Sequence, residues 1–195
     1  MKYIKIENKI IKPKKSLGQN FIIDKKIIDK ITKITDIYNK KILEIGPGLG
    51  TLTDKILSYN PKELIIIEKD KNLYELLLKK YKNKKVKIIN EDILNFNFKK
   101  INNYKIISNL PYNISSKLLF KLLTLNNDIY EIVCMIQSEL ATKFDYSLGK
   151  MNKYKFISKY RSNYNIKFNV SPNVFIPKPK VNSKVLLFKI IKKKI

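Results

Sequence analysis

The sequence predicts an α/β fold with a mostly parallel sheet, on the strength of two observations. Short apolar runs alternate with segments whose hydrophobic residues recur at helical spacing. A glycine-rich segment at 44–51 follows the first apolar run of this series and leads into a helical pattern. A chain of 195 residues with 44% hydrophobic residues can bury the core that such a sheet needs.

The predicted elements follow one another without an evident linker. The first helix is expected at 24–38, because isoleucines recur there at helical spacing and Asp24 occupies the N-cap position. The predicted strands are the apolar runs 41–45, 63–67, 86–89, 104–108 and 131–136, and the other helices are 70–81 and 115–123. After Gly149 the pattern becomes irregular, and a Pro-rich turn at 172–179 precedes a last alternating strand at 183–191. We expect a single domain, residues 1–195.

The composition argues against several classes of protein. Residues 1–15 are charged throughout and no later segment approaches the length of a membrane span, so we expect a cytoplasmic protein without membrane contact. Cys134 is the only cysteine, which excludes an internal disulfide, and its apolar surroundings predict a core position. The absence of histidine removes the usual ligand of zinc and the usual base of a nucleophile pair. No metal is expected.

The net charge of +25 indicates nucleic-acid binding, because lysines that neutralise phosphates release counterions. A coding bias is the alternative, since lysine, isoleucine and asparagine make up nearly half the chain. The lysines nevertheless cluster, at 12–15, 79–85, 178–180 and 192–194. We therefore predict salt-dependent contacts to phosphate, with specificity that comes from shape.

The tetrapeptide Asn109-Leu110-Pro111-Tyr112 directly follows the predicted strand 104–108 and predicts chemistry on an adenine. An asparagine oxygen and a backbone carbonyl held by the following proline can both accept hydrogens from an exocyclic amine, while the tyrosine ring stacks on the base. Taken alone, the four residues are also compatible with a strand that ends in a turn.

The glycine segment at 44–51 predicts a site for a nucleotide-like ligand. Its spacing is Gly-x-Gly-x-Gly, and it lacks the lysine and the serine or threonine of a phosphate-binding loop, which favours a ligand without a pyrophosphate. Glu68 follows the next strand, where its carboxylate can accept both ribose hydroxyls, and Asp92 follows the third strand, where it can bind the adenine amine. Together these strand ends predict a site for one adenosine.

Several motifs, in order along almost the whole chain, resemble those of the class I S-adenosylmethionine-dependent methyltransferases. The resemblance is closest to the ribosomal RNA adenine N(6),N(6)-dimethyltransferases of the small subunit. The matching segments are 16–21, 44–51, Glu68, 91–93, 109–115, 137–139 and 177–183. The resemblance implies a Rossmann-like, mostly parallel seven-stranded sheet flanked by helices. It also implies transfer of methyl groups to the 6-amino groups of two adjacent adenosines near the 3′ end of small-subunit rRNA.

The resemblance further implies roles for individual residues. S-adenosyl-L-methionine would be the cofactor, and the residues expected to bind it are Asn20, Ile22, Gly46, Glu68, Asp92 and Asn109. Residues 1–22 would form a basic N-terminal arm and cofactor lid. The target adenine would be held by the catalytic residues Asn109, Leu110, Pro111 and Tyr112, with Phe175 as a second aromatic surface. The expected partner is small-subunit rRNA in a pre-ribosomal particle, bound by a monomer.

The chain also departs from the family pattern. Related enzymes carry a small helical domain after the segment that corresponds to 181–188, and we expect that domain to be absent because the sequence ends at Ile195. Where the family usually has Tyr-Gly-Arg-Leu, this chain has the residues of 151–154. Two alternatives remain: a large-subunit adenine methyltransferase of the antibiotic-resistance type, and a non-catalytic RNA-binding assembly or transcription factor. The second predicts loss of Glu68, Asp92 or Asn109, and all three are present.

Overall fold

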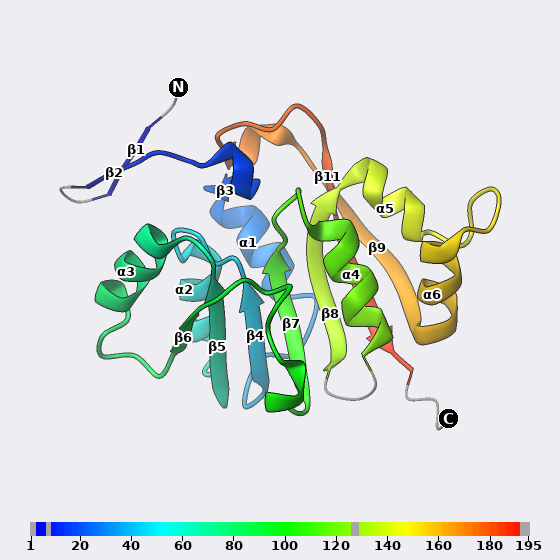
Figure 1. Cartoon of the computed structure of the whole chain (residues 1–195), viewed down its shortest axis with the longest axis horizontal. Coiled ribbons are helices and arrows are strands. Elements are labelled where there is room, and N and C mark those ends of the chain that lie inside the picture. The colour runs from blue at the N-terminus through cyan, green and yellow to red at the C-terminus, as the bar shows by residue number, and fades with distance from the viewer. Residues whose placement is uncertain (1–2, 7–8, 126–128, 192–195) are drawn as a thin grey trace.

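The computed structural model describes residues 3–6, 9–125 and 129–191, and within them a seven-stranded sheet forms the centre of the molecule (Figure 1). The strand order is β6-β5-β4-β7-β8-β11-β9. The strands are β4 (Lys41–Ile45), β5 (Glu63–Glu68), β6 (Lys87–Asn90), β7 (Tyr104–Asn109), β8 (Ile129–Gln137), β9 (Ser162–Val170) and β11 (Ser183–Ile190). The pairings from β6 to β8 are parallel, whereas β11 is antiparallel to both β8 and β9. The predicted fold class is confirmed.

Helices cover both faces of this sheet. They are α1 (Lys25–Thr32), α2 (Thr51–Ser58), α3 (Lys71–Lys80), α4 (Ser115–Thr124), α5 (Ser138–Phe144) and α6 (Lys153–Arg161), with short 3-10 turns η1 (Lys15–Leu17), η2 (Phe98–Lys100) and η3 (Pro172–Val174). Two small antiparallel pairs lie outside the main sheet: β1 (Ile4–Ile6) with β2 (Lys9–Ile11), and β3 (Phe21–Ile22) with β10 (Phe175–Ile176).

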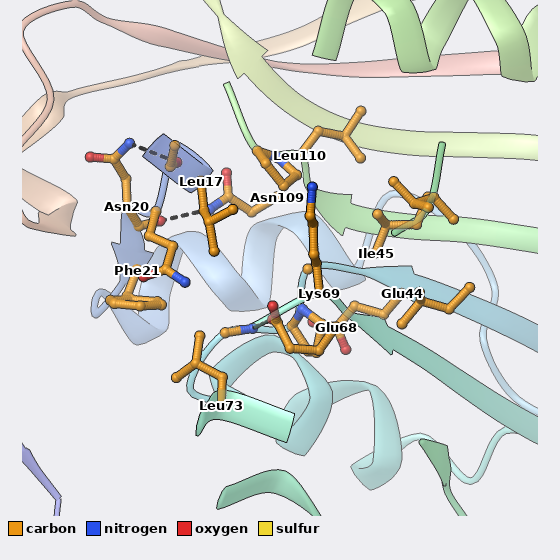
Figure 2. A pocket seen from close by; sticks show the side chains of 18 of the residues that line it. Leu17, Asn20, Phe21, Glu44, Ile45, Glu68, Lys69, Leu73, Asn109 and Leu110 are labelled. Atoms are coloured by element: carbon orange, nitrogen blue, oxygen red, sulfur yellow. Dashed lines mark hydrogen bonds between the residues drawn. The ribbon is translucent and has the colours of Figure 1, made fainter. Parts of the chain in front are cut away.

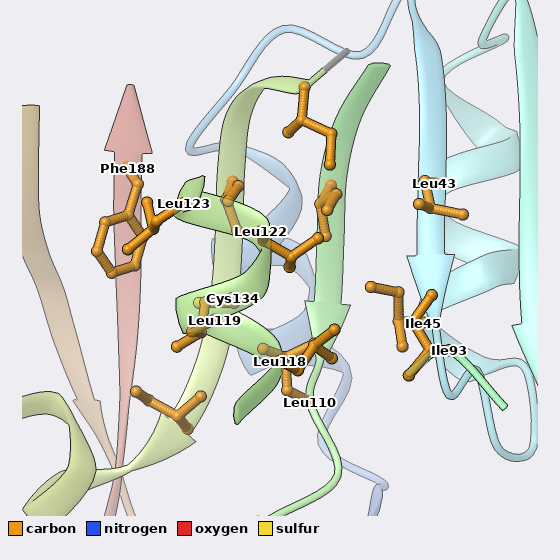
Figure 3. Packing of buried hydrophobic residues seen from close by; sticks show 14 of the residues in the cluster. Leu43, Ile45, Ile93, Leu110, Leu118, Leu119, Leu122, Leu123, Cys134 and Phe188 are labelled. Carbon is orange, nitrogen blue, oxygen red and sulfur yellow. The ribbon is translucent and has the colours of Figure 1, made fainter. Parts of the chain in front are cut away.

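The central strands are apolar on both sides, as a sheet covered by two helical layers requires. Successive residues of β8 enter different clusters: Cys134 packs in the cluster that includes α4 and α5, and Val133 in the cluster that includes α1 and α2. Figure 3 shows the first cluster, in which leucines of α4 lie over β7 and β8. The predicted core position of Cys134 is confirmed, since its side chain is fully buried.

Two aspartates mark where helices begin. Asp24 accepts hydrogen bonds from the backbone N–H groups of Lys26 and Ile27 at the start of α1, and Asp70 accepts one from Asn72 at the start of α3. The predicted N-cap of the first helix is therefore correct, but the helix ends at Thr32 rather than near residue 38.

The segment after Gly149 is more regular than the sequence pattern indicated, because it forms α6 and the strand β9. β9 lies at the edge of the sheet, and most of its side chains between Ser162 and Val170 are exposed or half-buried. An edge strand of this kind needs no alternating apolar face, so its sequence carries a weak strand signal. The buried side chains of α6 include Lys155 and Arg161, which interrupt the apolar periodicity of the helix.

We predict that Gly50→Ala lowers the free energy of unfolding by about 3 kcal/mol. Gly50 has a φ of 78° at the N-terminus of α2, and an added Cβ would collide with the Tyr81 hydroxyl group. Gly149→Ala is the matched control: its φ is 56° but the nearest atom, Lys155 Nζ, would lie 3.8 Å away, so the backbone strain alone should cost about 1 kcal/mol. Urea unfolding of both variants measures the difference, and equal losses would contradict the steric argument.

Candidate active site

A pocket opens at the carboxyl edge of the sheet, where the chain order reverses between β4 and β7. From β4 the chain continues outward to β5 and β6 on one side, and it returns to β7 on the other side. Open α/β sheets bind their ligands at such a switch point. The predicted site residues that line this pocket are Asn20, Ile22, Gly46, Glu68, Asp92, Asn109, Leu110, Pro111 and Tyr112.

The glycine segment and the Asn-Leu-Pro-Tyr tetrapeptide face each other across this switch point. Gly46 has a φ of 64°, and a Cβ on it would lie 3.2 Å from Pro111 Cγ. A side chain at position 46 would therefore press on the proline that shapes the tetrapeptide. This contact places the two motifs next to each other.

Glu68 ends β5 with a buried carboxylate that is only partly used by the protein. One oxygen accepts a hydrogen bond from the Asp70 N–H at 2.8 Å, and the other accepts one from the Gly48 N–H at 3.3 Å. A carboxylate has about four acceptor sites, so acceptor capacity remains for hydroxyl groups of a ligand. Burial raises the pKa of Glu68 to about 7, against the backbone hydrogen bonds that lower it.

Glu44 is a second buried carboxyl group in the pocket lining, and it was not among the predicted site residues. It lies on β4 two residues before Gly46, and its Oε2 accepts a 2.6 Å hydrogen bond from Thr53 of α2. Burial raises the pKa of Glu44 to about 8, although the Thr53 hydrogen bond opposes this shift. An acidic residue inside an otherwise apolar strand, next to a glycine segment, was the sequence signal for it.

Asn109 lines the pocket, and its amide oxygen is left without a partner. Its Nδ2 donates a 3.0 Å hydrogen bond to the Asn20 carbonyl, whereas its Oδ1 is buried without a hydrogen-bond partner (Figure 2). A buried acceptor left without a partner is costly, and such atoms point to a ligand. The neighbouring Leu110 carbonyl accepts only a long, 3.5 Å bond from Ser115, so it too retains acceptor capacity.

Tyr112 lines the pocket, and contacts with Ser183 and Phe175 hold its ring in place. Its hydroxyl group lies 2.6 Å from the Ser183 Oγ, and its ring meets that of Phe175 at 6.4 Å and 72°. Phe175 is 2% exposed, packs in the core cluster of α1 and α2, and is not among the residues that line the pocket. Its contact with Tyr112 places it one layer behind the pocket, and a direct role on a base stays a prediction.

Asp92 lies in the turn two residues after β6, and both of its oxygens have partners. Oδ2 accepts from Lys69 Nζ at 2.8 Å, and Oδ1 accepts from the Leu94 N–H at 2.9 Å. The hydrogen bond from Lys69 holds the pKa of Asp92 below its usual value. Lys69 was not predicted, and it sets the orientation of this carboxylate at the pocket rim.

The arm that closes one side of the pocket is attached to α3. Asp70 accepts hydrogen bonds from Lys14 Nζ at 2.8 Å and from Gln19 Nε2 at 2.9 Å. On the other side of the arm, Asn113 Nδ2 donates to the Ser16 carbonyl at 2.8 Å. Lys14, expected to contact nucleic acid, is thus engaged within the protein.

The described residues contain no helix long and apolar enough to cross a membrane. Across the same residues, no group of three or more histidine, cysteine, aspartate or glutamate side chains is arranged to hold a metal ion.

The strand order, the reversed β11 and the pocket at the switch point together define a class I methyltransferase fold. The solved structure of a dimethyladenosine transferase from Plasmodium falciparum is similar to this chain with a TM-score of 0.76 and 26% identity, covering 88% of this chain and 63% of that chain. The structure of the 23S rRNA methyltransferase ErmE is similar with a TM-score of 0.79 over 89% of this chain and 71% of that chain, and at 23% identity it shows the fold alone.

The chain belongs to the ribosomal RNA adenine dimethylase family, which matches residues 10–195. It is 40% identical over 185 residues to the ribosomal RNA small subunit methyltransferase A of Pelagibacter ubique (strain HTCC1062), across 91% of this chain and 70% of the relative. The same enzyme of Mesomycoplasma hyopneumoniae (strain 232) is 43% identical over 178 residues, across 90% of this chain and 68% of that relative. The sequence-based prediction of a small-subunit rRNA adenine dimethyltransferase is confirmed by these matches.

We predict that the free energy of unfolding falls by about 2–4 kcal/mol between pH 5 and pH 8. Glu44 and Glu68 have pKa values of about 8 and about 7 in the folded chain, against 4.5 ordinarily, so the folded state binds more protons in this range and loses stability as the pH rises. The chain has no histidine, so no imidazole titrates in the same window. Urea unfolding at pH 5, 6.5 and 8 measures the effect.

Glu44→Gln should remove much of this pH dependence, because the amide resembles the protonated carboxyl group. Glu139→Gln is the matched control, since that side chain is 83% exposed. A pH-independent stability in the unmodified protein would contradict the assignment of buried, protonated carboxyl groups.

Proposed function

We propose that this chain uses S-adenosyl-L-methionine to methylate the 6-amino groups of two adjacent adenosines near the 3′ end of small-subunit rRNA, giving N(6),N(6)-dimethyladenosine. The family and the names of the curated relatives support the reaction and the class of RNA. We further propose that it acts as a monomer in the cytoplasm on a pre-ribosomal particle. The substrate then is an RNA in which the target bases can leave their stack.

The unpaired Asn109 Oδ1 is the observation on which this proposal rests. An exocyclic amine offers two hydrogens, and Asn109 Oδ1 and the Leu110 carbonyl are two acceptors with free capacity in the same lining. Hydrogen bonds that hold both amine hydrogens in this way free the nitrogen lone pair from conjugation with the ring, which increases its nucleophilicity. The Tyr112 ring, fixed through Ser183, provides the surface on which the base stacks.

The residues opposite Asn109 fit the proposed cofactor. Acceptor capacity of Glu68 remains for the ribose hydroxyls, and Asp92, oriented by Lys69, lies at the end where the adenine would be held. Asn20 and Ile22 of the arm would close over the ligand, with Gly46 beneath it. Bound S-adenosylmethionine supplies a methyl group made electrophilic by its sulfonium.

The chemistry required of the protein is then mainly positioning. The attacking amine is neutral and needs no base before transfer, which agrees with a chain that has no histidine. Two methylations of one nitrogen require that the Asn109 and Leu110 acceptors hold an amine that keeps one hydrogen after the first transfer. The second transfer therefore depends on fewer hydrogen bonds than the first.

The direct test is incubation of the protein with labelled S-adenosylmethionine and undermethylated small ribosomal subunits, followed by mass-spectrometric mapping of the modified adenines. The expected product is dimethyladenosine at two adjacent positions near the RNA 3′ end. Cofactor binding without any transfer would overturn the proposal, and methylation confined to large-subunit RNA would favour a different adenine target.

Two substitutions should separate amine positioning from cofactor binding. We expect Asn109→Ala to reduce the rate of methyl transfer by about 100-fold or more, because it removes a positioned acceptor at the reacting amine. Glu68→Ala should instead weaken binding of S-adenosylhomocysteine by about tenfold or more, because the ribose hydroxyls lose their carboxyl acceptors. Isothermal titration with S-adenosylhomocysteine and single-turnover kinetics measure the two effects. Equal losses of ligand affinity in both variants would contradict this division of roles.

A further inference from the structure

The C-terminal part of the chain carries positive charge without compensation. Residues 146–195 contain twelve lysines and Arg161 but no aspartate or glutamate, so they account for +13 of the net charge of +25. The last acidic residue, Asp145, is buried and accepts hydrogen bonds from the Ser147 N–H at 3.1 Å and Oγ at 2.6 Å. A coding bias towards lysine does not by itself explain why acidic residues, frequent elsewhere, are missing here.

Within this region α6 exposes two aromatic rings. Phe156 is 59% exposed and Tyr160 is 41% exposed, one helical turn apart, and their rings are almost parallel, with centroids 5.9 Å apart and an interplanar angle of 5°. Leu148 and Met151, in the connection that leads into α6, are also exposed. We call these four residues the α6 face; Figure 1 shows α6 at the outer side of the molecule, at the end opposite β1 and β2.

The α6 face is held by buried polar contacts. Lys155 is buried, and its Nζ donates to the Leu148 carbonyl and, at 3.1 Å, to the Lys150 carbonyl. Asn152 caps the helix through the N–H groups of Tyr154 and Lys155. Because the Lys155 ammonium group donates to two carbonyls of the connection, it holds the connection against α6. The exposed apolar side chains of the α6 face therefore belong to an ordered surface.

We propose that the α6 face is a second RNA-contact surface, on which bases of a single-stranded segment stack on Phe156 and Tyr160 while exposed Lys150 and Lys159 contact phosphates. The inference rests on the proposed function for its RNA substrate but assigns a surface outside the methyl-transfer pocket. Stacking on aromatic side chains beside lysines is how proteins bind single-stranded RNA without reading its sequence.

Charge favours RNA over a protein partner at this surface. A second copy of the chain would place another region with +13 and no acidic residue against the first. Glu139, the acidic residue of the neighbouring helix α5, is already paired with Lys143 at 3.0 Å. A polyanion with flat apolar rings matches both the charge and the shape of the α6 face.

The chain contains no tryptophan, so Phe156→Trp places a single fluorescent reporter on the α6 face. Titration with a transcript of the 3′-terminal segment of small-subunit rRNA should quench this tryptophan with the dissociation constant that filter binding gives. Tyr38→Trp is the matched control, because Tyr38 is 68% exposed in the turn between α1 and β4. Three outcomes would overturn the inference. RNA could bind without quenching at position 156, quenching could be equal at both positions, or the signal could change with protein concentration alone.

The double variant Phe156→Ala/Tyr160→Ala should raise the dissociation constant for the same RNA by about fivefold or more, with unchanged S-adenosylhomocysteine binding and unchanged transfer rate at saturating RNA. Phe156→Leu should weaken binding almost as much as Phe156→Ala, because it keeps apolar bulk but no flat ring. Tyr38→Ala should have no effect. Unchanged RNA affinity in the double variant would overturn the proposed RNA contact at the α6 face. RNA binding without any methyl transfer in the unmodified protein would count against the proposed function alone.

Discussion

The hydrogen bond from Asn109 Nδ2 to the Asn20 carbonyl determines what the pocket can do. An amide side chain has one donor end and one acceptor end, and this bond uses the donor end. The acceptor, Oδ1, is left buried without a partner in a residue that lines the pocket. The same bond ties the N-terminal arm to the end of β7, so the arm and the reacting site depend on each other.

Near the strand ends that lead to this bond, a side chain links β4 to β7. Their backbone pairing ends at Leu43 and Ile106, so the two strands separate before they reach the pocket. Ser108 bridges the gap, because its Oγ donates to the Ile45 carbonyl and accepts from the Ile45 N–H at 3.2 Å. A side chain here replaces the backbone ladder between the two strands, next to the glycine segment and Asn109.

The sequence was sufficient for the parts of the molecule that obey local rules. Buried strands such as β5, with apolar residues throughout 64–67, have continuous apolar sequences, and the N-caps at Asp24 and Asp70 have the expected residue type. It was insufficient for β9, an edge strand without an apolar pattern, and for the end of α1. In each case the secondary structure depends on contacts with residues distant in sequence, and a local sequence pattern carries no information on those contacts.

The same limit applies to the site. The residues of the tetrapeptide and the strand ends could be predicted, because motif and strand position both pointed to them. The Lys14 pairing with Asp70 could not, since those residues are brought together only by the fold. Phe175 was predicted as a second aromatic surface for the base, whereas its pairing in β10 with β3 and its packing in the core cluster place it behind Tyr112.

Acidic and basic residues lie in different parts of this chain, and each part suits one of the two ligands that the chain is proposed to bind. The pocket lining contains Glu44, Glu68, Glu91 and Asp92, with Lys69 as its only basic residue, in a chain with 41 basic and 16 acidic residues. A chain of net charge +25 would repel a sulfonium cation, and acidic groups gathered in one enclosed site oppose this repulsion where they are ionised, as at Asp92, whose pKa is lowered. The basic remainder attracts the RNA phosphates, so cofactor and RNA do not compete for one kind of charge. The buried Glu44 and Glu68 carboxyl groups cost stability as the pH rises, because burial opposes their ionisation.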